Sequence, residues 1–230
     1  MRVVLKIGGS LLYQDNRIQV DVIREYSKSI EEALRAGHDF VVITGGGASA
    51  REFIAAARAL GGSESNCDFL GIDLARKNAE LFTIALGDKA YPEVVESIDE
   101  LEAAMQSGRV VFMGGLTPGQ STNAVAALAA EITGADILLN ATNVEGVYNR
   151  DPDEGDAVLL EELSIEDLND ILSRGGTRAG EYHLFDPVAI RIVRRSKIKT
   201  VFFDGRDVGN LGRILNGERI GSFVIHNNNK

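Results

Sequence analysis

Residues 110–127 read VVFMGGLTPGQSTNAVAA, a short apolar run that passes through glycines into a helical pattern. This order is typical of a strand, a loop and a helix in an α/β fold. Gly114, Gly119 and Ser121 match the phosphate-loop pattern G-x-x-x-x-G-K-[ST], but Gln120 stands where that pattern has lysine. Two interpretations are open at this point: a phosphate loop that lacks its lysine, or a loop that holds another ligand.

The same order of strand and helix recurs along the whole chain. Runs rich in Val, Ile and Phe, with the near-continuous apolar character of strands covered on both faces, occupy 2–7, 39–44, 109–113, 135–141 and 199–204. Helical periodicity predicts helices between Ile18 and Gly37 and at about 48–60, 66–86, 97–107, 121–133, 164–173, 187–196 and 206–215. Asp186 before Pro187 is a predicted N-cap. The alternation predicts a mainly parallel sheet between layers of helices, with a long functional loop or hairpin at about 143–160.

The bulk composition limits the possible partners. A chain of 230 residues fits one large α/β domain, or two lobes that share one sheet. Its formal net charge of −10 argues against nucleic acid as a partner. The single cysteine, Cys67, cannot form an internal disulfide and indicates a reducing compartment. No apolar segment approaches the roughly 20 residues of a membrane span, and the N-terminus does not resemble a signal peptide. We therefore expect a cytoplasmic protein without a membrane partner.

Glycines follow three of the predicted strands, at 8–10 (GGS), 45–47 (GGG) and 114–115 (GG). A single glycine after a strand is most often a turn, but ligands of parallel sheets bind at the carboxyl ends of strands. Lys6 lies two residues before the first glycine loop, and Arg51 lies four residues after the second. Each alone is ordinary surface charge. Together with the glycine loops they indicate an anionic ligand and phosphoryl transfer.

No residue set indicates a protein-bound metal or a hydrolytic triad. The histidines His38, His183 and His226 are scattered, and Cys67 has no second ligand at a suitable spacing. We therefore predict no metal site made by protein side chains.

Six segments, in this order, resemble the amino acid kinase superfamily and, within it, the archaeal-type UMP kinases. They are LKIGGSLL (5–12), ITGGGASAR (43–51), DFLGI (68–72), GGLTPGQSTNAVAA (114–127), ATNVEGVYNRDP (141–152) and DPVA (186–189). The segment TNVEGVYNRDP is the most specific, and the resemblance covers nearly the whole chain. It resolves the first question, because the loop after Gly114 is similar to the family's acceptor loop, which has no lysine.

The resemblance implies a fold, a reaction and partners. The fold is one αβα sandwich over 1–230 with a mainly parallel sheet of about eight strands. The reaction is ATP + UMP giving ADP + UDP, in pyrimidine nucleotide (CTP and UTP) biosynthesis. The lobe at about 1–134 would bind the acceptor UMP, and the lobe at about 135–230 would bind ATP with its Mg²⁺. Relatives of this kind are commonly homohexamers.

The resemblance also implies roles for individual residues. The catalytic residues would be Lys6, Arg51 and Asn123. The residues that contact ATP would be Lys6, Gly8, Gly9, Ser10, Gly47, Arg51, Thr142, Asn143, Tyr148 and Asp151. Those that contact UMP would be Gly46, Asp68, Leu116, Thr117, Pro118, Gly119, Gln120, Ser121 and Thr122. Asp68 has a second interpretation as a helix N-cap, and Tyr148 as a packed aromatic.

One departure from the family pattern keeps alternatives open. Asn123 stands where the family usually has an aspartate that organises the active-site lysine. Two further features argue against particular branches of the superfamily. The second lysine of the acylamino acid branch is absent near Asp186, and Ala48 stands where the isopentenyl phosphate branch has a histidine just after its glycines. Another small-acceptor kinase of the superfamily remains the alternative enzyme. A non-catalytic protein that binds nucleotides or oxoanions is the alternative of a different class.

Overall fold

The structure is a computed structural model that describes residues 1–150, 155–174 and 185–226. Its centre is a seven-stranded sheet in the order β5-β4-β1-β6-β8-β9-β7, and only the β8–β9 pair is antiparallel. The strands are β1 (Arg2–Ile7), β4 (Asp39–Thr44), β5 (Val111–Met113), β6 (Ile137–Thr142), β7 (Glu162–Ser164), β8 (Thr200–Asp204) and β9 (Ser222–Ile225). A separate hairpin joins β2 (Tyr13–Gln14) to β3 (Arg17–Ile18).

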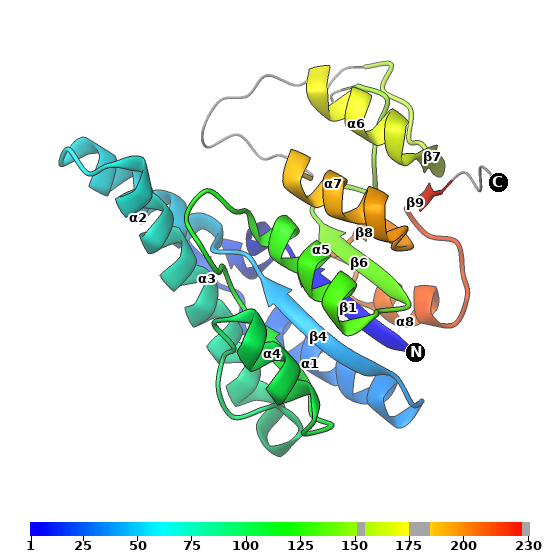
Figure 1. Ribbon diagram of the computed structural model, residues 1–230, viewed down its shortest axis with the longest axis horizontal. Helices are drawn as coiled ribbons and strands as arrows, with labels where there is room; N and C mark the ends of the chain where they lie inside the picture. Colours follow the sequence, from blue (N-terminus) through cyan, green and yellow to red (C-terminus); the bar gives the residue numbers. More distant parts are fainter. Residues whose placement is uncertain (151–154, 175–184, 227–230) are drawn as a thin grey trace.

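Helices cover both faces of the sheet (Figure 1). They are α1 (Val20–Arg35), α2 (Gly47–Ala59), α3 (Glu64–Leu86), α4 (Ile98–Met105), α5 (Thr122–Thr133), α6 (Ile165–Arg174), α7 (Pro187–Ser196) and α8 (Gly209–Leu215), with short 3₁₀ helices η1 (Gly9–Leu12) and η2 (Gly87–Lys89). One apolar core lies under α4, α5, α6 and α7, and the other under α1, α3 and α8. Because alternate strand residues enter alternate cores, β1, β4, β6 and β8 are buried on both faces.

The predicted αβα sandwich is therefore confirmed, with one difference in the strands. The five strands read from apolar runs are present, but the described residues contain seven strands in the main sheet rather than about eight. The strands β7 and β9 were not predicted. Both are short, and the two ends of β7 are the polar residues Glu162 and Ser164, so neither has a long apolar run.

The helix ends follow local capping chemistry. Asp186 is the N-cap of α7 as predicted, and its side chain accepts hydrogen bonds from the N–H groups of Val188 and Ala189. Ser63 caps α3 in a capping box with Asn66, so this helix begins two residues before the predicted position 66. The N-cap interpretation of Asp68 is consequently wrong, because Asp68 lies inside the helix.

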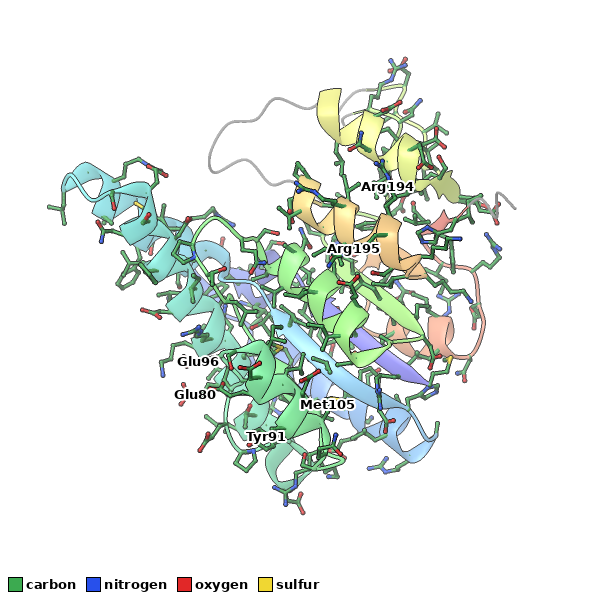
Figure 2. All side chains as sticks on the ribbon, in the orientation of Figure 1. Glu80, Tyr91, Glu96, Met105, Arg194 and Arg195 are labelled. Atoms are coloured by element: carbon green, nitrogen blue, oxygen red, sulfur yellow. The ribbon has the colours of Figure 1, made fainter. Side chains whose placement is uncertain are left out.

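Charged side chains project from the outer surfaces of the helices (Figure 2). Arg194 and Arg195 of α7 form ion pairs with Glu166 of α6 and Glu131 of α5, which join three helices of one layer. Such exposed pairs contribute at most about 1 kcal/mol each, so burial of the two cores accounts for most of the stability of the sandwich. No helix in the described part of the chain is long and apolar enough to cross a membrane.

Candidate active site

A cleft of about 390 Å³ lies at the carboxyl ends of β1 and β4. This is the edge at which parallel sheets bind their ligands. Its lining includes the predicted residues Lys6, Gly9, Ser10, Gly46, Gly47, Arg51, Asp68, Gln120, Ser121, Thr122 and Asn123, together with Asp186. Residues far apart in the sequence thus meet in one cleft, and among the described residues its wall contains the cations Lys6 and Arg51.

The first two glycine loops form the floor of this cleft by direct backbone contact. A Cβ atom on Gly9 would lie 2.2 Å from the backbone nitrogen of Gly47. Gly47 has a φ of 70°, and a Cβ there would lie 2.5 Å from a ring carbon of Tyr13. Asn78 supports the second loop, because its side-chain nitrogen donates to the carbonyl oxygen of Gly45 at 2.7 Å. No larger residue fits at Gly9 or Gly47 without moving the backbone.

The third glycine pair has a packing role in addition to its place beside the cleft. A Cβ on Gly114 would lie 2.5 Å from the backbone nitrogen of Arg76, and one on Gly115 would lie 2.7 Å from a side-chain carbon of Ile72. Both neighbours belong to α3. These glycines therefore allow α3 to lie against the end of β5. Close packing thus accounts for glycine at positions 114 and 115, and the sequence pattern alone could not separate this role from ligand binding.

Lys6 is buried and points into the site. Its side chain lines the cleft although the residue is only 4% exposed. Its ammonium nitrogen lies 3.7 Å from the position of a Cβ on Gly8. Burial lowers the pKa of Lys6 from 10.5 to about 8, because desolvation penalises the charged form. Lys6 is thus not a solvated strand-edge lysine, and a perturbed lysine in a cleft is typical of a functional site.

The cleft has a second, accessible cation and a neutral amide. Arg51 lies in the first turns of α2 and is exposed, so it can follow a ligand. Asn123 lies in the first turn of α5 and is 6% exposed. Its side-chain oxygen accepts a hydrogen bond of 3.1 Å from the side-chain nitrogen of Asn140 on β6. Asn140 was not predicted as part of the site, since it lies within an apolar strand sequence.

The loop before α5 is held on both sides of the cleft. Asp68 on α3 accepts a hydrogen bond of 2.8 Å from the backbone N–H of Gly119, whose φ of 77° favours glycine. The hydroxyl of Ser121 donates to the carboxylate of Asp186, the cap of α7. Gln120, Ser121 and Thr122 line the cleft. The other predicted UMP residues, Leu116, Thr117, Pro118 and Gly119, are in the same loop but outside the cleft lining.

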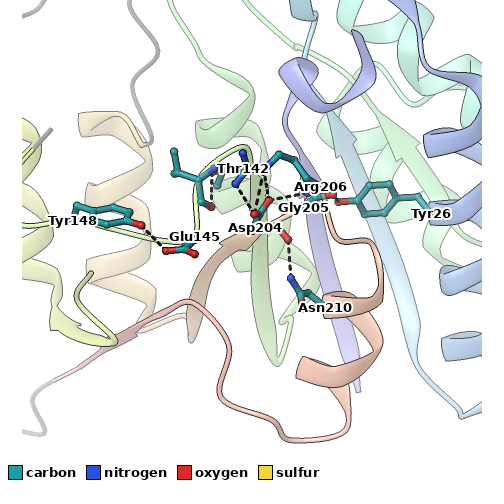
Figure 3. Close-up of polar contacts among 9 residues, drawn as sticks. Tyr26, Thr142, Glu145, Tyr148, Asp204, Gly205, Arg206 and Asn210 are labelled. Atoms are coloured by element: carbon teal, nitrogen blue, oxygen red, sulfur yellow. Dashed lines mark hydrogen bonds and ion pairs between the residues drawn. The ribbon is translucent and has the colours of Figure 1, made fainter. Parts of the chain in front are cut away.

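The predicted ATP residues of the later segment form a separate cluster (Figure 3). Thr142 ends β6, and its carbonyl oxygen accepts from the N–H of Gly205 at 2.7 Å, which joins the ends of β6 and β8. The Tyr148 hydroxyl donates to Glu145 at 2.7 Å, and this bond raises the pKa of the phenol. This contact is local, so the ATP role of Tyr148 stays a prediction. Asn143 is exposed beside this cluster, and Asp151 lies outside the described residues.

An ion pair at the end of β8 belongs to the same cluster and was not predicted. Arg206 pairs with Asp204 at 2.7 Å, and this contact lowers the pKa of the Asp204 carboxyl. The carbonyl oxygen of Gly205 accepts from the buried hydroxyl of Tyr26 at 2.8 Å. The sequence contained a usable indication, because Asp204 ends a predicted strand and Gly205 follows it, as glycines follow the other strands.

The described residues contain no group of three or more His, Cys, Asp or Glu side chains that could hold a metal ion. The cleft instead combines two cations with a glycine-rich backbone, a set that binds phosphate oxygens.

Comparison with known proteins identifies the family of this chain. The pattern of the family described as "Amino acid kinase family" matches residues 1–204. The chain belongs to this family. The uridylate kinase of Methanothermobacter thermautotrophicus is 43% identical over 226 residues, which cover 98% of this chain and 99% of that protein. The uridylate kinase of Sulfolobus acidocaldarius is 43% identical over 228 residues, with the same coverage of both chains.

Solved structures agree with the membership in the amino acid kinase family. The crystal structure of the uridylate kinase from Archaeoglobus fulgidus superimposes with a TM-score of 0.86 at 40% identity, over 97% of this chain and 100% of that one. A UMP kinase structure from Bacillus anthracis, at 20% identity, has a TM-score of 0.81 and shares the fold. The family and the fold class predicted from the sequence are both confirmed.

Proposed function

We propose that this amino acid kinase is a UMP kinase, which transfers the γ-phosphoryl group of ATP to UMP and releases UDP and ADP. The observation that carries the proposal is the cleft with Lys6 and Arg51 in a chain 43% identical, over nearly its whole length, to a uridylate kinase. The reaction would supply UDP for UTP and CTP, and so belongs to pyrimidine nucleotide biosynthesis.

The chemistry of the acceptor explains why this site needs no general base. The second pKa of a phosphate monoester is about 6, so an oxygen of UMP is already ionised at neutral pH. The barrier is electrostatic, because a dianionic acceptor must approach the γ-phosphate of ATP. Lys6 and Arg51 supply positive charge at the cleft, and the glycine loops let phosphate oxygens approach the backbone.

The strand order supports a division of the site between the two nucleotides. In the sheet, β1 lies between β4 and β6. The acceptor would bind on the β4 side, against Gly46, Asp68 and the loop 116–122, within residues 1–134. ATP would bind on the side of β6 and β8, near Thr142, Asn143 and Tyr148, within residues 135–230. Lys6 on the central strand would then meet the transferred group between the two.

The donor set fits magnesium that arrives on ATP. Asp68 and Asp186 are the carboxylates in the cleft lining, and each already accepts a hydrogen bond from the loop before α5. When bound, Mg²⁺ would neutralise charge on the β- and γ-phosphates. Lys6, Arg51 and the glycine loops would hold the phosphate oxygens that are not on the metal.

We also expect this chain to form a homo-oligomer, and a hexamer by its resemblance to archaeal-type UMP kinases. Helix α2 and the adjoining end of α3 extend beyond the sheet (Figure 1), and they expose Phe53, Leu60 and Phe69. Large apolar side chains on a projecting hairpin are typical of a contact between subunits. Light scattering coupled to size exclusion measures the mass, and a monomer at micromolar concentration would contradict this expectation.

The test of the function is ADP release by the purified protein with ATP and Mg²⁺. The acceptor panel is UMP, CMP, AMP, isopentenyl phosphate and N-acetylglutamate, and we expect turnover with UMP above all others. Turnover with only isopentenyl phosphate or N-acetylglutamate would identify another small-acceptor kinase. ATP binding without turnover on any acceptor would identify a non-catalytic binding protein, and Asn123 would be the first residue to change to aspartate.

A further inference from the structure

Asn140 is a buried amide in β6, in which Ile137, Leu138, Leu139 and Ala141 contribute apolar side chains to the two cores. It is 1% exposed, and its neighbours Leu139 and Ala141 belong to one apolar core. A buried amide is costly unless its polar atoms are hydrogen-bonded. Asn140 is absent from the cleft lining, so contact with substrate does not explain it. Its place in the sheet does.

Asn140 lies directly beside Lys6. The two residues are register partners on the adjacent parallel strands β1 and β6. Side chains of such partners project from the same face of the sheet, with the strands about 4.8 Å apart. That face is the one covered by α5, because Val4 and Leu138, two residues before each partner, pack in the core under α5. Asn123 approaches from α5 and completes the group.

The hydrogen bond between the two asparagines has a direction. The side-chain nitrogen of Asn140 donates to the side-chain oxygen of Asn123 at 3.1 Å. An asparagine amide has one end that accepts and one that donates, and rotation by 180° exchanges them. With its oxygen held toward β6, Asn123 has its NH₂ end on the other side of the amide, and Asn123 itself lines the cleft.

We propose that Asn140 is a positioning residue that fixes the orientation of the Asn123 amide, with the oxygen toward β6 and the NH₂ end toward the transfer cleft. This inference rests on the proposed kinase function. An NH₂ group donates to a phosphate oxygen, whereas an inverted amide would direct its oxygen at the same negative charge and repel it. Asn140 thus lets a neutral amide at position 123 present a hydrogen-bond donor to the cleft.

The test is a double-mutant cycle, since the proposal requires the two residues to act together. Asn140→Leu removes the donor and preserves the approximate volume. We expect kcat to fall about tenfold, with the KM for UMP and for ATP within about twofold. In an Asn123→Asp background the same change should alter kcat less than about twofold, because the two oxygens of a carboxylate are equivalent and no orientation is lost. Asn123→Ala is a second background with the same expectation.

Controls separate positioning from general destabilisation. Thr200→Val removes a buried hydroxyl from the neighbouring strand β8 and should leave kcat within about twofold. Asn140→Ser serves if the leucine variant does not fold, and it should also lower kcat. An unchanged kcat in the folded Asn140 variant would overturn the proposal. So would the same loss in the Asn123→Asp and Asn123→Ala backgrounds as in the wild type.

The orientation can also be measured without turnover, which separates this proposal from the kinase function. In ¹⁵N-labelled protein, we expect the side-chain NH₂ protons of Asn140 to exchange slowly with solvent. Those of Asn123 should shift when ATP with Mg²⁺ is added. The proposed orientation would be overturned if the side-chain NH₂ protons of Asn123 exchanged slowly and their chemical shifts did not change on addition of ATP. Absence of UMP turnover in the wild type would contradict the kinase function alone.

Discussion

The two rims of the site are built in different ways. The rim at the ends of β1 and β4 is held by backbone packing, with Gly9 against Gly47 and no space for a single added carbon. The rim at the ends of β6 and β8 is joined by a backbone hydrogen bond from Gly205 to Thr142. Its other contacts include exposed side-chain pairs, Arg206 with Asp204 and Tyr148 with Glu145. The Arg206 side chain is 62% exposed. The first rim can position reacting groups closely, while the second can exchange its partners for a ligand.

This difference predicts unequal sensitivity to mutation. Steric overlap with backbone cannot be relieved by a side-chain rotation, so it costs more than loss of an exposed pair worth about 0–1 kcal/mol. Changes at the first rim should therefore affect folding and turnover. Changes at the second should affect mainly the KM for ATP. The following changes test that division in order of decreasing effect.

The largest effect is expected from Gly9→Ala. The added Cβ would lie 2.2 Å from the Gly47 nitrogen, so one loop must move, and we expect a loss of about 3 kcal/mol in the free energy of unfolding together with most of the turnover. Gly212→Ala is the matched control. Gly212 lies inside α8 with no atom close to an added Cβ, so alanine should stabilise by about 0.5–1 kcal/mol. Urea unfolding of both variants measures these changes. Equal free energies of unfolding would contradict the claim that the backbone at Gly9 leaves no space for a Cβ atom.

Lys6→Ala should lower kcat by about a hundred- to a thousandfold, since loss of one group that stabilises transition-state charge has an effect of this size. The KM for UMP should change little, because Asp68 and the loop before α5 would hold the acceptor. Steady-state kinetics with each nucleotide varied in turn measure both quantities. Unchanged turnover would remove Lys6 from the mechanism.

The pH dependence should reveal the same lysine. The pKa of Lys6 is about 8, so kcat/KM for ATP should fall as the pH rises through 8 and the ammonium is lost. Asn123→Asp places a carboxylate in this cleft and should move the fall to higher pH. The free energy of unfolding should have the opposite trend. Between pH 8 and 10.5 Lys6 binds more protons in the unfolded chain than in the folded one, so its contribution to the free energy of unfolding increases as the pH rises. A profile unchanged by Asn123→Asp would contradict this assignment.

Asp68→Asn should raise the KM for UMP about five- to tenfold, because a charge-assisted hydrogen bond to the Gly119 N–H becomes a neutral one. The KM for ATP should stay within twofold. Equal weakening of both nucleotides would instead mean that Asp68 supports the structure as a whole.

The smallest effect is expected from Tyr148→Phe on the second rim. The variant loses only the hydroxyl that donates to Glu145, on the exposed side of the cluster. The KM for ATP should change by about twofold to threefold, with kcat and the KM for UMP unaffected. A fall in kcat like that of Lys6→Ala would show that the second rim positions reacting groups too, and would end the distinction between the rims.

Much of this molecule could be predicted from local patterns. Continuous apolar runs located β1, β4, β5, β6 and β8, and Asp186 before Pro187 located the start of α7. The strands β7 and β9 could not be found in this way. Both begin with a polar residue, Glu162 or Ser222, and neither has a continuous apolar run as long as that at 109–113. Asp68 had two interpretations until the structure put the cap of α3 at Ser63.

The sequence by itself determined the α/β class, the glycine loops at the strand ends, the family resemblance and the two cations Lys6 and Arg51. These features are local, or are read in order along the chain. Only the tertiary structure decided which strands are neighbours, and so placed Asn140 beside Lys6, Gly9 against Gly47, and Ser121 on Asp186. The physical reason is that such contacts join residues far apart in the sequence. Their energies depend on burial and register, which exist only after the sheet has formed.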